Sequence, residues 1–174
     1  MGDNPSAILG RMSRYTAVVR RLGTRRWFAA LGSRLSSVDR RLHVLTRGRW
    51  SVLGRHELPT MLLTTTGRKS GLPRTQLLLY AVDGDGYVVV GSNWGQAHHP
   101  AWSANLLAQP AARVTLGDRE VDVHATPAEG AERDRLWALV QRIWPAYTAY
   151  AERADGREIR IFRLTPGSGG AQGS

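Results

Sequence analysis

The stretch "TMLLTTTGRKSGLPRTQLLLYAVDGDGYVVVGSN", residues 60–93, decides the fold. Three runs rich in aliphatic and β-branched residues are separated by a Gly-rich turn and by the two Asp-Gly pairs of residues 83–86. Asp-Gly pairs between such runs are typical of β-hairpins, because glycine readily adopts the positive φ of a tight turn. The stretch therefore predicts consecutive strands joined by short turns.

The rest of the body adds short strands and few helices. Two further strands are predicted within residues 112–127 and a final strand at 157–165. A short helix is predicted within residues 99–110 and a long one over 131–144, which Pro145 interrupts or ends. This order lacks the strand–helix alternation of a doubly wound sheet. We expect a mainly β (α+β) fold, a small mixed or antiparallel barrel of about six strands with one long helix before the last.

The N-terminal part differs from the body in charge and periodicity. Apolar residues recur every three or four positions over residues 8–22 and 27–45, which predicts two amphipathic helices. Residues 1–55 contain 12 Arg and two acidic residues, whereas residues 56–174 contain 12 basic and 12 acidic residues, so the whole net charge of +10 lies in the first part. We expect three segments: a basic amphipathic helical arm (1–50), a barrel domain (51–166) and a disordered tail (167–174).

The charge of the arm indicates an anionic partner, either a lipid surface or nucleic acid. Basic helices with apolar stripes are typical of segments that lie on an anionic membrane. Nucleic-acid binding is not expected, because the body is neutral and the arm is patterned as apolar stripes. The alternative is that the arm packs on the barrel, which suits residues 27–45 better than residues 8–22.

Composition excludes several classes of site. Without cysteine there is no disulfide and no thiolate nucleophile or ligand. No run of about 18 apolar residues and no secretory signal is seen, so we expect a cytoplasmic protein, peripheral on the inner face of the cell membrane if the arm binds lipid. Adjacent His98 and His99 diverge and lack a third ligand, so no metal is expected. Ser70, Ser92 and Ser103 lack a nucleophile elbow, which disfavours hydrolysis and leaves the chemistry to a bound cofactor.

The Gly-rich turn is the first candidate site. Arg68, Lys69 and Arg74 place three cations within residues 68–74, and Lys69 is the only lysine of the chain. Ser70 adds a hydroxyl donor. Phosphate and carboxylate groups bind such donors, guanidinium in two-pronged fashion and ammonium as a point charge. A solvated basic hairpin turn explains the pattern equally well, and the spacing is not that of a P-loop.

Two further segments are candidates. In residues 88–102 a strand ends in small residues before a helix start, which offers backbone N–H donors to an anion or to ring carbonyls. Core packing is the expected role of at least one of Trp94 and Trp102. Three aromatic residues at spacings of three share one helical face, namely Trp144, Tyr147 and Tyr150. They could cover a planar ligand or pack against the barrel.

Three motifs in this order and spacing, "LLTTTGRKSGLPR…LLY", "VVVGSNWG…HPAW…NL" and "P.Y..Y", resemble the deazaflavin-dependent nitroreductase family of actinobacteria. The resemblance covers roughly residues 40–165 and leaves the arm largely outside. It implies an FMN-binding split-barrel-like fold, a split β-barrel with N-terminal helices, that binds coenzyme F420. An arginine-rich chain without cysteine fits an actinobacterial source.

The resemblance also implies cofactor contacts. The phosphate and polyglutamate tail would contact Arg68, Lys69, Ser70 and Arg74. The deazaflavin ring would lie beside Thr75, Gln76, Leu77, Leu78 and Leu79. The remaining contacts would come from Val90, Gly91, Ser92, Asn93, Ala101, Trp102, Ser103, Ala104 and Asn105. Tyr147 would close the pocket.

The implied reaction is hydride transfer from C5 of the reduced deazaflavin to a quinone, a nitroaromatic compound or another activated acceptor. Ser92 or Tyr147 would hydrogen-bond the acceptor or deliver a proton. The substrate pocket would be lined by Leu79, Trp144, Tyr147 and Tyr150. Leu79 and Trp144 stand where active nitroreductases tend to have tyrosine, and Asn93 where a basic residue can occur. These departures favour an apolar acceptor such as a quinone over a nitroimidazole.

Two alternatives remain open at this level. The first is an FMN-binding oxidoreductase on the same barrel, because FMN also offers a phosphate and a planar ring. The second is a non-catalytic F420-binding protein, which would bind the coenzyme but reduce no acceptor. The relative affinity for F420 and FMN distinguishes an F420 enzyme from an FMN enzyme. Reduction of an acceptor distinguishes an enzyme from a protein that only binds the coenzyme.

Overall fold

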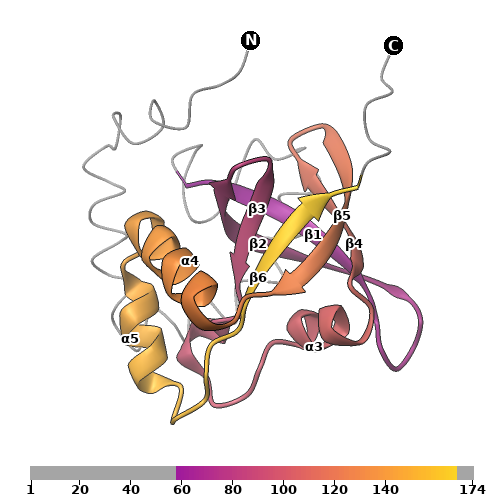
Figure 1. The fold of residues 1–174 in the computed structure, drawn as a ribbon. Coiled ribbons are helices and arrows are strands. Elements are labelled where there is room, and N and C mark those ends of the chain that lie inside the picture. Colours follow the sequence, from indigo (N-terminus) through magenta and orange to yellow (C-terminus); the bar gives the residue numbers. More distant parts are fainter. Residues whose placement is uncertain (1–57, 168–174) are drawn as a thin grey trace.

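A computed structural model describes residues 58–167 of the 174-residue chain. The predicted arm helices and nearly all of the predicted tail lie outside these residues. Within them, six antiparallel strands close into a barrel in the order β1-β2-β3-β6-β5-β4 (Figure 1). The strands are β1 (Thr60–Thr66), β2 (Pro73–Asp83), β3 (Gly86–Val90), β4 (Ala111–Leu116), β5 (Arg119–Pro127) and β6 (Ile161–Pro166). The predicted six-stranded barrel is confirmed.

The hairpins follow from the turn residues. β2 pairs with β3 up to Asp83 and Gly86, and Gly84 between them has a φ of +61°. β4 pairs with β5 around Gly117, whose φ is +64°. Glycine reaches this left-handed region without the steric cost of a Cβ. Both hairpins agree with the Asp-Gly and Gly-Asp signals of the sequence.

Three α-helices accompany the barrel in the described part of the chain: α3 (Ala101–Ala108), α4 (Gly130–Ile143) and α5 (Ala146–Arg153), with a short 3-10 turn, η3 (Asn93–Gly95). In Figure 1, α4 and α5 lie along one side of the barrel and α3 lies near one end. No helix within residues 58–167 combines the length and hydrophobicity needed to span a bilayer.

The predicted long helix is α4, but the separate helix α5 was not predicted. Pro145 has no N–H to donate and its ring clashes with the preceding turn, so α4 ends at Ile143 and a new helix starts at Ala146. Trp144 lies between the two helices, so the prediction that it shares one continuous helical face with the tyrosines of α5 is wrong. The last strand begins at Ile161, four residues later than expected.

Two hydrophobic clusters lie on opposite faces of the barrel wall. One fills the barrel, where Trp102 and Leu106 of α3 pack with strand residues such as Val89 and Phe162. The other lies between the wall and helices α4 and α5, and contains Val88 and Ile161. Neighbouring residues on β3 and β6 thus enter different clusters, as expected from the alternation of side chains along a strand.

Candidate functional site

The turn between β1 and β2 is held tightly by its own backbone. Gly71 N donates to Gly67 O at 2.7 Å, and Gly67 N donates to Leu72 O at 2.9 Å. Gly71 has a φ of +68°, which favours glycine. A Cβ at Gly67 would lie 2.8 Å from Ser70 Oγ and 3.1 Å from Leu72 O, so a side chain there would require the turn to shift. Both glycines therefore suit this loop geometry.

Asn105 of α3 joins the turn to the barrel. Its Nδ2 donates to Thr65 Oγ1 at 3.1 Å, and its Oδ1 accepts a hydrogen bond from Arg68 N at 3.2 Å. The Asn105 side chain is buried, so it is not presented to solvent as the basic side chains are. This predicted contact residue therefore fixes the start of the basic turn.

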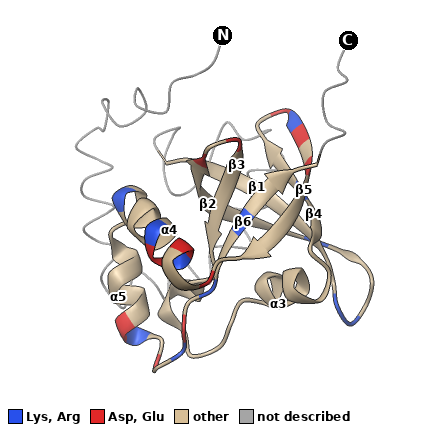
Figure 2. Cartoon of the chain, viewed as in Figure 1, with Lys and Arg blue, Asp and Glu red and all other residues tan. Residues whose placement is uncertain are grey.

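The cations of the turn have no acidic partners in the part of the chain that the structure describes. Arg68, Lys69 and Arg74 are exposed, and none of them forms an ion pair with a described carboxylate. Elsewhere on the barrel such pairs do form, as between Arg135 and Asp83 at 2.7 Å. Figure 2 shows the isolated basic tip of the β1–β2 turn. Uncompensated positive charge of this kind attracts anions.

Strand β2 runs from this turn with its side chains only half covered. Thr75 Oγ1 lies 2.9 Å from Thr64 Oγ1 on the neighbouring strand. Residues 75–80 are all half-buried. Leu78 packs against the cluster inside the barrel and Leu79 against the cluster beneath α4 and α5. The strand therefore offers partly covered apolar surface beside the cationic turn.

The end of β3 has an unusual backbone. Asn93, Trp94 and Gly95 have φ angles of +47°, +58° and +78°, so three consecutive residues occupy the left-handed region. Residues with a Cβ seldom adopt this conformation, and it persists where the surroundings enforce it, often at binding sites. Ser92, immediately before them, is buried. The strained segment thus adjoins one of the two predicted catalytic residues.

Helix α3 connects the end of β3 with the basic turn. A Cβ at Gly91 would lie 3.6 Å from Ser103 Cβ, so the strand end and the helix are in close contact. Trp102 and Ser103 are buried, whereas Ala101 and Ala104 keep more of their surface. Together with the hydrogen bond between Asn105 and Arg68, this contact brings three predicted groups of site residues to one side of the barrel.

The predicted pocket aromatics pack against one another beneath α4 and α5. Trp144 and Tyr150 are 2% exposed and Tyr147 is 6% exposed. Trp144 Nε1 donates to Tyr150 Oη at 3.4 Å, and the rings of Tyr147 and Tyr150 lie edge to face with centroids 6.2 Å apart. Leu79 and Val90 belong to the same hydrophobic cluster. Tyr147 is therefore linked to the site strands through a shared core.

Burial raises the pKa of Tyr147. Removal from water raises the pKa of its phenol far above the usual value, and the neighbouring Tyr150 raises it further. The phenol therefore stays neutral over the whole physiological pH range. In that state it can donate a hydrogen bond to a ligand.

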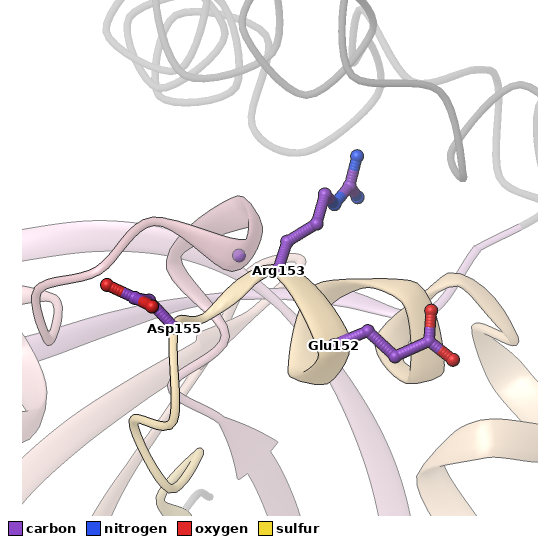
Figure 3. Close-up of a pocket in the computed structure, with 4 residues that line it drawn as sticks. Glu152, Arg153 and Asp155 are labelled. Carbon is purple, nitrogen blue, oxygen red and sulfur yellow. The ribbon is translucent and has the colours of Figure 1, made fainter.

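A surface depression of about 590 Å³ is lined by Gly95, Glu152, Arg153 and Asp155, none of which is a predicted site residue. In Figure 3 the three charged side chains point in different directions and do not converge on one point. A binding site needs convergent polar groups, so this depression is a poor candidate. No set of three or more metal-ligating side chains in residues 58–167 is placed to hold a metal ion.

Arg157 is a contact residue that the sequence did not indicate. It lies in the connection between α5 and β6, yet its guanidinium donates to the carbonyl oxygens of Gly91 and Ser92 at 3.2 and 2.8 Å. These contacts span more than 60 positions of the chain. An arginine at the start of a predicted strand has no pattern that would reveal them.

The chain is similar to several known proteins. A family model described as F420H(2)-dependent quinone reductase matches residues 31–166. An F420H(2)-dependent quinone reductase of Mycobacterium tuberculosis is 39% identical over 110 residues, which cover 62% of this chain and 73% of that protein. The solved structure of an F420-H2 dependent reductase is 36% identical, with a TM-score of 0.56, and covers 61% of this chain and 93% of its own. Another solved structure, described as a domain-swapped dimer, is 32% identical, with a TM-score of 0.58 and coverage of 73% and 96%.

Proposed function

The chain belongs to the F420H(2)-dependent quinone reductase family, and from this premise we propose how its own residues bind coenzyme F420 and serve hydride transfer to a quinone. The predicted family resemblance, the F420-dependent oxidoreductase activity and the coenzyme are confirmed. The FMN alternative finds no support in the family match. Mycobacterial relatives fit the expected actinobacterial character.

The observation that carries the binding proposal is the uncompensated charge of the β1–β2 turn. Arg68, Lys69 and Arg74 offer exposed cationic donors with no described carboxylate to neutralise them, and Ser70 adds a hydroxyl. A phosphate followed by carboxylates needs donors of this kind. The turn therefore fits the anionic tail of F420, with Asn105 holding the turn in place from α3.

The ring is proposed to contact the elements that adjoin this turn. These are β2 over residues 75–79, the end of β3 over residues 90–93, and α3 over residues 101–105. Support comes from the contacts that bring them together, between Asn105 and Arg68 and between Gly91 and Ser103. The buried members of α3 support the surface, and its more exposed members, Ala101 and Ala104, leave room for a close approach.

The chemistry needs few protein groups. When bound, the reduced coenzyme supplies a hydride. A quinone oxygen that gains charge is stabilised by a hydrogen-bond donor or by proton delivery. We assign this role to Ser92 and to the neutral phenol of Tyr147. Tyr147→Phe should lower kcat and leave the Kd for F420 unchanged, and an unaltered kcat would remove Tyr147 from the reaction.

The acceptor pocket is proposed to be bounded by Leu79 and Tyr147. Trp144 and Tyr150 would hold Tyr147 in place, since both are buried in the same hydrophobic cluster as Tyr147. The apolar side chain of Leu79 and the aromatic group suit a planar, apolar acceptor better than a polar nitroimidazole. This agrees with the quinone named in the family description.

The N-terminal arm is proposed to hold the enzyme on an anionic membrane, where lipid-soluble quinones are found. The support is in the sequence: residues 1–55 carry 12 Arg and two acidic residues, and residues 8–22 repeat apolar side chains at helical spacing.

The binding proposal is tested by a fluorescence titration with F420 and, in parallel, with FMN. Lys69→Ala should weaken F420 binding by roughly five- to tenfold, because it removes one charge-assisted contact. Arg119→Ala is the matched control, since it removes an exposed cation from the β4–β5 turn at the other end of the barrel (Figure 1). Equal effects of the two substitutions, or a preference for FMN, would contradict the proposal.

A further inference from the structure

The guanidinium of Arg157 makes four contacts with one loop, residues 91–99. Its Nε donates to Gln96 O at 3.1 Å, one terminal nitrogen donates to Gly91 O at 3.2 Å, and the other donates to Ser92 O at 2.8 Å. No carboxylate within residues 58–167 forms an ion pair with it. Burial, together with neighbouring Arg160, lowers the pKa of its guanidinium. The three hydrogen bonds of its guanidinium to carbonyl oxygens thus all go to the segment from Gly91 to Gln96.

A fourth contact joins Arg157 to His99. One terminal nitrogen of the guanidinium lies 3.2 Å from His99 Nδ1. Arginine has donors only, so Nδ1 must be the accepting nitrogen and the ring proton must sit on Nε2. Burial and the charges of Arg160 and Arg157 lower the pKa of His99 and favour this neutral form. Arg157 therefore contacts both ends of the loop from Gly91 to His99.

The loop that Arg157 contacts contains two of the three non-glycine residues with positive φ within residues 58–167. Asn93 and Trp94 both have positive φ, and Gly95 continues the left-handed turn. Local contacts alone are modest: Asn93 Nδ2 donates to His98 O at 3.0 Å, and Gly95 N donates to Ser92 O at 2.9 Å. Such a conformation persists only where other groups enforce it. The carbonyls bound by Arg157 flank the strained residues on both sides.

We propose that Arg157 is a positioning residue for the reaction: it clamps the left-handed turn at the end of β3 and thereby fixes the backbone that presents Ser92 to the acceptor. The proposal rests on the proposed function of Ser92. The shortest contact of Arg157 is to the backbone carbonyl of Ser92, so it fixes this residue without engaging its hydroxyl. Lysine cannot replace it, because one ammonium group lacks the planar fork that reaches three carbonyls at once.

The test compares Arg157→Lys with Arg133→Gln in the full chain. Arg133 is a matched control because it binds the same connection before β6, with Nε 2.7 Å from Glu158 Oε1 and a contact to Ile159 O at 3.4 Å, but does not touch the loop from Gly91 to His99. Arg157→Lys should lower kcat for a soluble quinone with F420H2 by roughly tenfold or more. The control should leave kcat within about twofold of the wild type.

A double-mutant cycle separates positioning from general stability. If Arg157 acts through Ser92, the loss caused by Arg157→Lys should largely disappear in a Ser92→Ala background. His99→Ala removes only the fourth contact, so its loss in kcat should be smaller and should also largely disappear in the Ser92→Ala background. This variant keeps the test decisive if Arg157→Lys does not fold. Additive losses for both variants, or a loss equal to that of Arg133→Gln, would overturn the proposal. A wild-type chain that neither binds F420 nor reduces quinone would instead refute the proposed function itself.

Discussion

The position of the basic turn depends on single side chains, and Asn105 is the most direct case. Both ends of its amide are engaged, by Thr65 on β1 and by the backbone N–H of Arg68 at the start of the turn. The turn is exposed, so it has little packing of its own to hold it. A buried amide on α3 therefore sets the place from which the exposed cations act.

Asn105→Ala should affect stability and coenzyme binding together. It leaves the backbone N–H of Arg68 without its partner and removes one of the hydrogen bonds of the buried Thr65 hydroxyl, which costs about 1–3 kcal/mol in the free energy of unfolding. Because the turn loses its anchor, the Kd for F420 should also rise several-fold. Urea denaturation and F420 titration measure the two effects.

The control for this prediction is Leu107→Ala on the same helix. Leu107 is exposed, and its truncation removes little buried surface. It should change neither the free energy of unfolding nor the Kd by much. A destabilised Asn105→Ala variant that binds F420 as tightly as the wild type would show that the turn does not depend on this anchor.

At the scale of elements, helix α4 is tied to the β2–β3 hairpin by Asp83. Arg135 of α4 donates to both oxygens of this carboxylate, at 2.7 and 2.8 Å, and Arg163 Nε of β6 lies 3.3 Å from it. The hydrogen bond from Arg135 lowers the pKa of Asp83. One carboxylate therefore links a helix, a hairpin turn and the last strand.

Asp83→Asn should lower the free energy of unfolding by about 1 kcal/mol at neutral pH, because Arg135 is half exposed and solvent screens the pair. The folded-state pKa is depressed, so the contribution is present above the unfolded pKa and is lost as pH falls below about 4. Urea denaturation at pH 7 and near pH 3 measures this. A difference between wild type and variant that persists unchanged in acid would contradict the assigned role of Asp83.

The elements themselves were predictable where short-range signals exist. The Asp-Gly pairs of residues 83–86 indicated the β2–β3 hairpin, and Pro145 marked the end of α4. By contrast, β6 pairs with both β3 and β5. The choice of these partner strands depends on the burial of whole strand faces and not on any local sequence pattern. The contacts of Asn105 with Thr65 and of Arg157 with Ser92 span 40 and 65 positions, so no local pattern could reveal them.

At the scale of the whole molecule, the chain divides its charge between two parts. The excess of +10 lies in residues 1–55, and the remainder is balanced. Flotation of the full chain with vesicles containing anionic lipid, beside a chain lacking residues 1–22, tests the proposed membrane contact. Binding should fall in the truncated chain and at high salt. Equal partitioning of the two chains would end the membrane proposal for this segment.

Hydride transfer from reduced F420 to a quinone is the reaction that this chain is expected to catalyse. The most direct measurement is anaerobic mixing of the full chain with F420H2 and a soluble naphthoquinone, following the return of oxidised-coenzyme fluorescence. We expect multiple turnovers, with one F420H2 consumed for each quinone reduced, and no comparable reaction with reduced FMN. Tight F420 binding without oxidation above the enzyme-free rate would contradict this expectation and identify a protein that binds the coenzyme without catalysis.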